Sequence, residues 1–543
     1  MFRVTPFILR LDHSNKEVLQ VMGIVNTEAR TERMEGRWLG LAALSVSGLV
    51  LGLDITVLVT ALPTLSAKLG ATTDQLQWMS AAYTLSLAGF MLPAGVLGDR
   101  FGRRRLLLIA LAAFGISSVA ASQVTTANGL IAMRVVMGVS GAVILPLMQA
   151  MLPVMFAPDE RQRALGFAGA GAFLGLPLGP LVAGFLLTHY EWGSIFLING
   201  PVVVLALIGA WFFVPESKDP NPRRLDWLGA VLEVVGVSAV VYAIIEEPVR
   251  GWGDVQVYAP LIGGALLLLA FVVWELRTRF PLVDLNLFRS ARFSWATVAF
   301  IVVGFGMTGV MFVISPFLQV VQGNDAQATG VRLLPLVIAM MAAAIGSDWL
   351  NKRLGTKVMS SAGMLGGAIS MLLLSRVTVD SGYGLVAVAL AIMGGSIAMT
   401  MIPALDAILG ELPEGETGGG SALTRTLQNV GASLGVAIMG SMLNSAYKSD
   451  VHDRLAALPA SLQSAAESGV AVAAAVAHHL PSPLAAQVLR AAQEAYVSGM
   501  SEVLMVTAGM MLVGGVLMAI FMPARAAAVV AGAPRPAGVG VAS

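Results

Sequence analysis

Four charged residues interrupt long apolar stretches of this chain of 543 residues, and their side chains are suited to handling protons or cations. They are Asp54, Arg134, Glu233 and Asp406. A charge placed at the centre of a hydrocarbon layer costs about 2.5–3.5 kcal/mol on insertion scales, so each side chain needs water, an ionic partner or a change of protonation. A buried acid could therefore bind a proton or a cationic ligand.

Asp54 and Arg134 are the strongest candidates. Burial favours the neutral form of a carboxyl group, so Asp54 is expected to exchange a proton or to bind a cation. A purely structural hydrogen-bond acceptor is the alternative. Arg134 could weaken the hold of a nearby acid on its proton, or it could form a permanent buried ion pair. Glu233 and Asp406 could be second proton or cation sites, or could simply be solvated near a membrane surface.

Residues 95–105 form a glycine-rich and charged hinge between two apolar runs. Four arginines fall within six positions, from Arg100 to Arg105. Such a cluster cannot enter hydrocarbon, and short loops rich in arginine stay on the cytoplasmic side of a membrane. The glycines allow tight turning, and Asp99 can pair with an arginine or accept hydrogen bonds from a helix N-terminus. The candidate gate residues of this loop are Gly95, Asp99, Arg100, Gly102 and Arg103.

A second glycine-rich segment lies within a predicted helix at about 165–187. Glycines four residues apart form a smooth face that allows close helix contact, and prolines bend a membrane helix. This helix is expected to close one side of a central cavity. The residues that define the segment are Gly175, Gly179, Pro180 and Gly184.

Aromatic residues in the predicted helices offer possible contacts for a flat cation. Rings can bind cations through their electron-rich faces. Packing in the core or against lipid is the alternative role for each of them. The candidates are Trp78, Tyr83, Phe173 and Phe312.

The elements that must position these residues are membrane helices. Hydrophobic residues make up 57% of the chain and the mean hydropathy is +0.80, whereas soluble domains have roughly 45–50% apolar residues. A membrane span needs about 20 apolar residues. Fourteen spans are predicted, at about 40–61, 77–97, 106–122, 128–151, 165–187, 194–214, 227–245 and 258–274, and then from near 294, 330, 358, 384, 420 and 501.

Charge in the loops predicts the orientation and the domain organisation. Lysine and arginine gather in the loops that follow even-numbered spans. This distribution predicts a multi-pass protein of the cell (inner) membrane with both chain ends in the cytoplasm. We expect a cytoplasmic extension at 1–39, which could begin at a later methionine, and a six-helix bundle at 40–215. Two inserted helices at 216–293 precede a second six-helix bundle at 294–522. That bundle contains a long outer loop at 444–500, whose alanine-rich stretches around Pro459 and Pro481 suggest short amphipathic helices rather than a span. The tail at 523–543 is cytoplasmic.

The two bundles are related by an internal repeat. An offset of about 255 residues places Gly175, Gly179 and Gly184 on Gly431, Gly435 and Gly440. An offset of 253 places Gly102 on Gly355 and Arg100 on Arg353. Internal repeats of this kind are typical of transporter folds.

Several function classes are excluded or disfavoured by composition. The absence of cysteine removes disulfides, thiolate metal sites and cysteine nucleophiles. No metal site is expected, because His478 and His479 lack a third ligand at suitable spacing. A membrane enzyme would need a polar catalytic cluster, which is not evident, and a receptor would need an output domain. The net charge of +1 gives no reason to expect nucleic acid as a partner, and no cofactor is expected.

Taken together, these segments resemble the 14-helix drug:proton antiporter family of the major facilitator superfamily, the EmrB/QacA type. The resemblance covers about residues 40–525, with Ala183 in place of a usual glycine and Gly193-Ser194 in place of a usual basic-aromatic pair. Its motifs are Gly-x-Leu-x-Asp-Arg-x-Gly-Arg-Arg from Gly95, Ala61-Leu62-Pro63, the Arg134 segment, Gly175–Gly184, Phe196-Leu197-Ile198-Asn199-Gly200-Pro201 after Trp192, Asp226-Trp227-Leu228-Gly229, and Pro316-Phe317-Leu318-Gln319 with Gly330 and Pro335.

The resemblance implies an all-α membrane protein that exports lipophilic, often cationic compounds by alternating access, driven by proton entry. Asp54 would handle the proton or cation, and Arg134 would tune the proton affinity of Asp54. Asp99 with its arginines would latch the inner gate. The implied partners are protons, small lipophilic or cationic substrates and the lipid bilayer; the need for an adaptor protein stays open. The alternative within this class is a dedicated exporter of one metabolite, antibiotic or lipid made by the cell itself.

Overall fold

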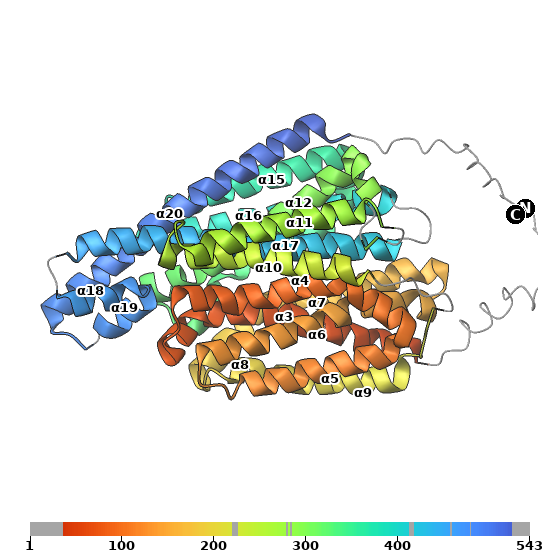
Figure 1. The fold of residues 1–543 in the computed structure, drawn as a ribbon, viewed down its shortest axis with the longest axis horizontal. Helices are drawn as coiled ribbons and strands as arrows, with labels where there is room; N and C mark the ends of the chain where they lie inside the picture. The colour runs from red at the N-terminus through yellow and green to blue at the C-terminus, as the bar shows by residue number, and fades with distance from the viewer. Residues whose placement is uncertain are drawn as a thin grey trace, which may run out of the picture.

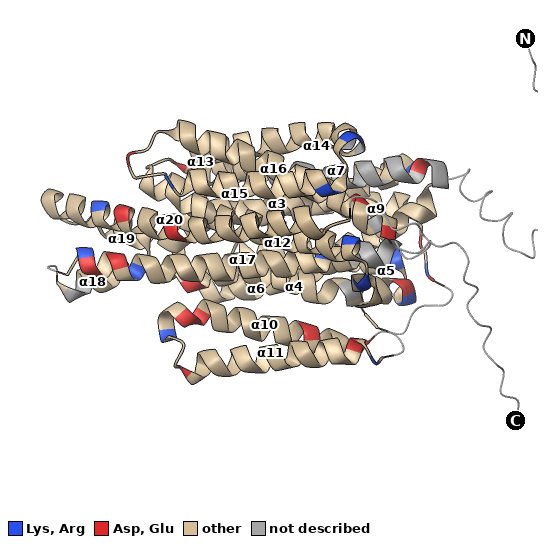
Figure 2. Cartoon of the chain, turned by 90° about the horizontal axis from the view of Figure 1, so that it is seen from above, with Lys and Arg blue, Asp and Glu red and all other residues tan. Residues whose placement is uncertain are grey.

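The structure is a computed structural model, and it describes residues 36–219, 226–278, 281–282, 285–411, 417–456, 459–477 and 479–523. Within these ranges the chain consists of helices and their connections, without strands, and the helices run along one common direction (Figure 1). The expected all-α membrane fold is confirmed. Lysine, arginine and acidic residues gather mostly toward the two ends of the helices (Figure 2). Residues 1–35 of the extension expected at 1–39 and residues 524–543 of the tail expected at 523–543 lie outside the described residues.

The first bundle is built from seven helical segments that form six predicted spans. Local sequence sets several of their ends: Thr126 accepts a hydrogen bond from the Gly129 amide at 3.2 Å and caps one helix. Another span is broken at Ile198 into two helices. The segments are α3 (Arg37–Leu69), α4 (Thr73–Phe101), α5 (Arg103–Ala121), α6 (Ala127–Met155), α7 (Pro158–His189), α8 (Ser194–Leu197) and α9 (Asn199–Phe213).

Two inserted helices, α10 (Trp227–Arg250) and α11 (Val255–Glu275), pack against each other, and α10 lies along α4 and α17. Figure 2 shows the pair beside the two bundles. Most of α11 faces away from the rest of the protein, since only 11% of the residues in its apolar stretch of 18 residues are buried. The pair therefore presents a broad apolar surface to the lipid.

The second bundle repeats the packing of the first. The helix α12 lies along α17 as α3 lies along α7, and α14 lies along α16 as α4 lies along α6. Its segments are η1 (Leu285–Arg289), α12 (Ala291–Pro316), the π-helical η2 (Phe317–Val321), α13 (Ala326–Arg332), α14 (Leu334–Leu354), α15 (Thr356–Leu374), α16 (Tyr383–Glu411), α17 (Thr417–Arg454) and α20 (Ser482–Phe521).

The backbone supports the internal repeat at its most distinctive position. Gly102 and Gly355 both precede a helix directly, and both have positive φ, at 113° and 80°. A side chain is strained in this region of backbone space, which explains why glycine stands at both places.

The outer connection is shorter than the loop predicted at 444–500, whereas short helices are present within it as predicted. The helix α17 continues to Arg454, and the last helix begins at Ser482 rather than near residue 501; between them lie α18 (Ala460–Glu467) and α19 (Val470–Ala477). The alanine-rich sequence favours helix, and Tyr447 fixes α17 to this region through a hydrogen bond of 2.8 Å to the Ala466 carbonyl. These helices project from one end of the molecule (Figure 1).

The number of spans is not confirmed at fourteen. Within the described residues, eleven helices are long and apolar enough to cross a membrane, or twelve if α4, bent by 53° beside Pro93, is counted as one span. The two predicted spans outside this count are α7, whose apolar segment Leu178–His189 is shorter, and α17. Each of the fourteen predicted spans nevertheless coincides with one helix or a pair of consecutive helices.

Candidate functional site

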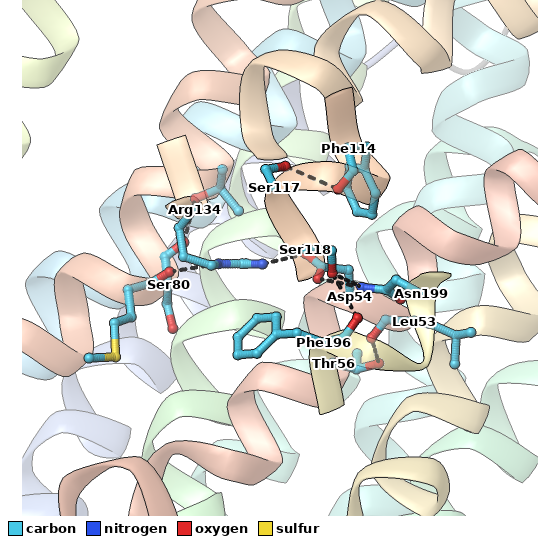
Figure 3. A network of polar contacts seen from close by, with 12 residues as sticks. Leu53, Asp54, Thr56, Ser80, Phe114, Ser117, Ser118, Arg134, Phe196 and Asn199 are labelled. Atoms are coloured by element: carbon cyan, nitrogen blue, oxygen red, sulfur yellow. Dashed lines mark hydrogen bonds and ion pairs between the residues drawn. The ribbon is translucent and has the colours of Figure 1, made fainter. Parts of the chain in front are cut away.

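The structure brings Asp54 and Arg134 together inside the first bundle. Arg134 Nη1 on α6 pairs with Asp54 Oδ2 on α3. Asp54 is only 3% exposed and Arg134 only 1%. The two are 80 residues apart in sequence, so their contact depends on the packing of the bundle (Figure 3).

Each partner is held by further groups. The Arg134 guanidinium donates from Nε to the Met79 carbonyl at 3.1 Å and lies over the Tyr83 ring, 4.1 Å from its centroid. Asn199 donates from Nδ2 to the second oxygen of Asp54 at 3.3 Å and to Ser118 Oγ at 3.0 Å. Helices α3, α4, α5, α6 and α9 therefore all contribute to one enclosed polar cluster.

Asn199 and Ser118 were missed in the sequence. Asn199 is the first residue of α9, directly after the break at Ile198, so its side chain can turn inward. Ser118 donates in turn to the Phe196 carbonyl at 2.9 Å, which is freed by the same break. The signal available in the sequence was the Asn199 side-chain amide itself, which stands in an apolar segment shortly before Pro201.

Glu233 and Asp406 do not join this cluster. Glu233 lies on α10, is 8% exposed, and its Oε2 has no hydrogen-bond partner in the described part of the chain. Glu275 of α11 approaches the same face of α10, because a Cβ on Gly229 would lie 2.6 Å from Glu275 Oε1. Asp406 is exposed on α16 and accepts a hydrogen bond of 3.3 Å from Asn351. The described hydrogen bonds and ion pairs of Asp54 go to Arg134 and Asn199 and not to these two acids.

The aromatic candidates occupy packed positions. Tyr83 is fully buried beneath Arg134, and its hydroxyl has no partner among the described residues. Trp78 lies 6.1 Å from Tyr242 on α10, between ring centroids, and Phe312 is 4% exposed in the core. The side chain of Phe173 lies outside the described part of the structure. In this conformation Tyr83 is an electrostatic partner of Arg134 rather than an open contact surface.

The glycine-rich loop ties the first bundle together at one end. Asp99 accepts a hydrogen bond of 2.8 Å from Arg103 Nε, and the Asp219 amide donates to the Asp99 carbonyl at 3.1 Å. Arg103 also donates to Ser217 Oγ at 3.2 Å. These polar contacts join the loop to residues 217–219, which follow α9 in the first bundle.

The glycines of this loop have different neighbours. Gly98 packs directly on Leu147 of α6, and Gly102 has positive φ next to Glu216. A Cβ on Gly95 would meet no atom within 4 Å. Gly95 is therefore not required by packing, whereas Gly98 and Gly102 are. Arg100 lies over the ring of Phe101 at 5.7 Å.

The glycine face of α7 forms the close contact with α3, and its copy on α17 forms the same contact with α12. A Cβ on Gly175 would lie 2.6 Å from the Leu49 carbonyl, and a Cβ on Gly179 would collide with Thr56. Gly431 and Gly435 pack in the same way on Ile301 and Phe305. Gly184 and Gly440 instead contact the opposite bundle, at α13 and α4.

Replacing Gly175 with alanine is expected to lower both stability and transport, because the added methyl group meets rigid backbone atoms of α3. Overpacking of this kind costs about 1–3 kcal/mol. Thermal unfolding of the purified protein measures the loss. The matched variant Gly95→Ala adds the same methyl group to a helix with open space, so its stability should stay equal or rise. Equal behaviour of the two variants would contradict the close-packing argument.

Comparisons with known proteins agree on one family. The model of the Major Facilitator Superfamily matches residues 44–436. The tetracenomycin C resistance and export protein of Streptomyces glaucescens is 30% identical over 90% of this chain and 92% of its own. The multidrug efflux pump LfrA of Mycolicibacterium smegmatis is 29% identical over 92% and 98%. The methyl viologen resistance protein SmvA of Salmonella typhimurium is 31% identical over 88% and 96%.

A solved structure supports the fold. The bacterial homolog of the human lysosomal transporter Spinster, in an inward-facing and unoccupied conformation, aligns with a TM-score of 0.65. The alignment covers 90% of this chain and 97% of that one at 16% identity.

Within the described residues, no group of three or more His, Cys, Asp or Glu side chains could hold a metal ion.

Proposed function

This chain belongs to the major facilitator superfamily, and we propose on that premise that it is a proton-coupled exporter of lipophilic compounds. It is a multi-pass membrane transporter and not an enzyme. The relatives named for multidrug efflux, for export of tetracenomycin C and for methyl viologen resistance support the direction of transport. The observation that carries the proposal is the enclosed pair of Asp54 and Arg134, because a carboxylate with a displaceable counter-ion can bind and release a proton.

The proposed cycle is alternating access of the bundles at 40–215 and 294–522. Contacts that close one end of their interface include a hydrogen bond of 2.7 Å between Thr84 and Ser433. Gln319 of η2 also donates to the Thr60 carbonyl at 2.7 Å. A cavity of about 20 Å³ at the interface, lined by Thr56 and Met311 among others, has room for about one water molecule. Substrate entry therefore requires the bundles to separate.

Each site element has a proposed role in this cycle. Asp54 binds the coupling proton, and Arg134 replaces the proton as its partner when it leaves. The loop with Asp99 and Arg103 holds the cytoplasmic end of the first bundle as a rigid unit, and the glycine face of α7 keeps it close to α3. Both chain ends are proposed to lie in the cytoplasm.

The proposal is tested by dye extrusion from an efflux-deficient bacterial host. Cells that express the protein should extrude ethidium, a lipophilic cation, or pyrenemethanol, a lipophilic neutral compound, faster than cells with an empty vector. A protonophore should remove this difference. Extrusion that persists after the proton gradient has collapsed would contradict proton coupling, and no extrusion of either dye would contradict broad export.

A dedicated exporter of one metabolite is the second candidate. The relative that carries the name of a single antibiotic, tetracenomycin C, favours it. The two candidates differ in substrate range. Resistance to many unrelated lipophilic compounds supports the multidrug exporter, and resistance to one compound class supports the dedicated exporter.

A further inference from the structure

Arg425 is a charged side chain of α17 that has no acidic partner among the residues that the structure describes. Its Nη1 lies 3.5 Å from Gln428 Oε1, at the outer limit of a hydrogen bond. No described carboxylate forms an ion pair with it. Arg425 is the ninth residue of the helix Thr417–Arg454 and lies in the first two turns of the span predicted from near residue 420, and its side chain is partly exposed.

The contacts of α17 show which way Arg425 points. Gly431 packs on Ile301 of α12. The Ser433 hydroxyl forms a hydrogen bond with the Thr84 hydroxyl of α4, and the Ser441 hydroxyl donates one of 2.6 Å to the Ile244 carbonyl of α10. At about 100° per residue, Ser433 lies about 200° and Ser441 about 280° around the helix from Gly431. Arg425 lies at about 120°, between α12 and α4 and almost opposite α10.

This direction leads to the space between the two bundles. The helix α4 belongs to the first bundle and α12 to the second, while α10 lies outside both. Asn429, at about 160° on the same count, points to a neighbouring part of this space. The guanidinium of Arg425 and the Gln428 amide, whose Oε1 lies 3.5 Å from Arg425 Nη1, therefore form one polar patch on the wall of the second bundle. Asn429 lies about 40° further around the helix.

An arginine inside a membrane protein stays charged and needs an acceptor. The buried acids of the spans do not provide one. Asp54 is paired with Arg134 inside the first bundle, and Glu233 lies on α10 near Glu275. The acceptor for Arg425 is therefore expected to come from outside the chain, through the space that opens when the bundles separate.

We propose that Arg425, with Gln428 and Asn429, forms a subsite that binds the acidic group of a lipophilic substrate, such as a carboxylate. A guanidinium donates paired hydrogen bonds that fit a carboxylate, and it repels a cation placed in the same position. The subsite rests on the proposed export function and adds acidic compounds to the lipophilic substrates. Asp54 keeps the separate task of binding the proton.

Binding of three pyrene probes to the purified protein in lipid nanodiscs tests this subsite. The probes 1-pyrenecarboxylate, 1-pyrenemethylammonium and 1-pyrenemethanol share one apolar body and differ in charge. Wild-type protein should bind the carboxylate most tightly. Arg425→Gln should weaken binding of the carboxylate about tenfold or more, the range for a hydrogen bond to a charged group, and change binding of the neutral alcohol less than about twofold.

Two further variants separate recognition from folding. Arg425→Lys keeps the charge but loses the paired geometry, so it should fall between wild type and Arg425→Gln for the carboxylate alone. Arg353→Gln removes an arginine that lies over Trp349 at the end of α14 and should leave all three affinities unchanged. Equal loss for the three probes in both Arg425 variants, or no loss for the carboxylate, would overturn the subsite and leave the export function standing. A wild-type protein that binds none of the probes would contradict export of lipophilic compounds itself.

Discussion

Replacing Asp54 with asparagine is expected to reduce proton-driven efflux to the level of membranes that lack the protein. Asparagine has the same size, and its amide oxygen can still accept the hydrogen bond from Arg134, while its NH2 group takes the place of the oxygen that faces Asn199. It cannot bind and release a proton in the working range of pH, so coupling should be lost while the protein still folds. Dye transport into inside-out vesicles, driven by an imposed pH gradient, measures the effect.

Two controls make the result specific. Downhill exchange of substrate, with no proton gradient, should continue in Asp54→Asn, because alternating access itself does not require the coupling proton. The variant Asp380→Asn removes a carboxylate that is 74% exposed and paired with Arg490 at 2.7 Å, and it should transport normally. Unchanged proton-driven transport in Asp54→Asn would remove Asp54 from the mechanism.

Replacing Arg134 with methionine is expected to be the most destabilising of the changes considered. Methionine fills a similar volume but leaves the Asp54 carboxylate buried without a counter-ion, which typically costs about 3–5 kcal/mol. It also removes the donor to the Met79 carbonyl and the cation over Tyr83. Equilibrium unfolding in mixed detergent micelles measures the free energy of unfolding.

A double variant tests whether this loss comes from the broken pair. In Asp54→Asn with Arg134→Met, no uncompensated charge remains in the cluster, so much of the stability lost in Arg134→Met should return. Non-additivity of this kind is the measure of a direct interaction. If the two losses simply add, the buried pair contributes no coupling and its contact is incidental.

The sequence predicted the members of the central cluster better than its geometry. Asp54 and Arg134 could be found because charges are costly in apolar runs. Their contact could not, because it joins helices 80 residues apart and depends on how the bundle closes. Asn199 and Ser118 were missed because neutral polar residues are common in membrane helices, and only the break after Ile198 turns the Asn199 amide toward Asp54.

Direction around a helix explains the other differences. Tyr83 was expected as a substrate contact, but the ring packs beneath Arg134. Glu233 faces the inserted helix α11, so an acid within a span need not face the centre of the protein. Arg425 escaped notice because it follows a polar, glycine-rich segment that resembles a loop in sequence. Hydropathy reports the depth of a residue but not the helix it faces.

The repeat was the most reliable long-range prediction. Gly102 and Gly355 share a positive φ before equivalent helices, and the glycines of α7 and α17 contact equivalent partners. In the outer region at 444–500, alanine-rich sequence correctly indicated short helices, because alanine strongly favours helix. The ends of α17 and α20 were placed wrongly, because hydropathy does not show how far a helix continues beyond its apolar segment.

Proton release by the purified protein tests the central claim most directly. Addition of a transported lipophilic substrate to wild-type protein in weakly buffered detergent solution should release protons, because substrate binding favours the state in which Asp54 pairs with Arg134. The same addition to Asp54→Asn should release none, although the substrate still binds. Equal proton release from both proteins, or none from the wild type despite binding, would contradict the assignment of Asp54 as the coupling site.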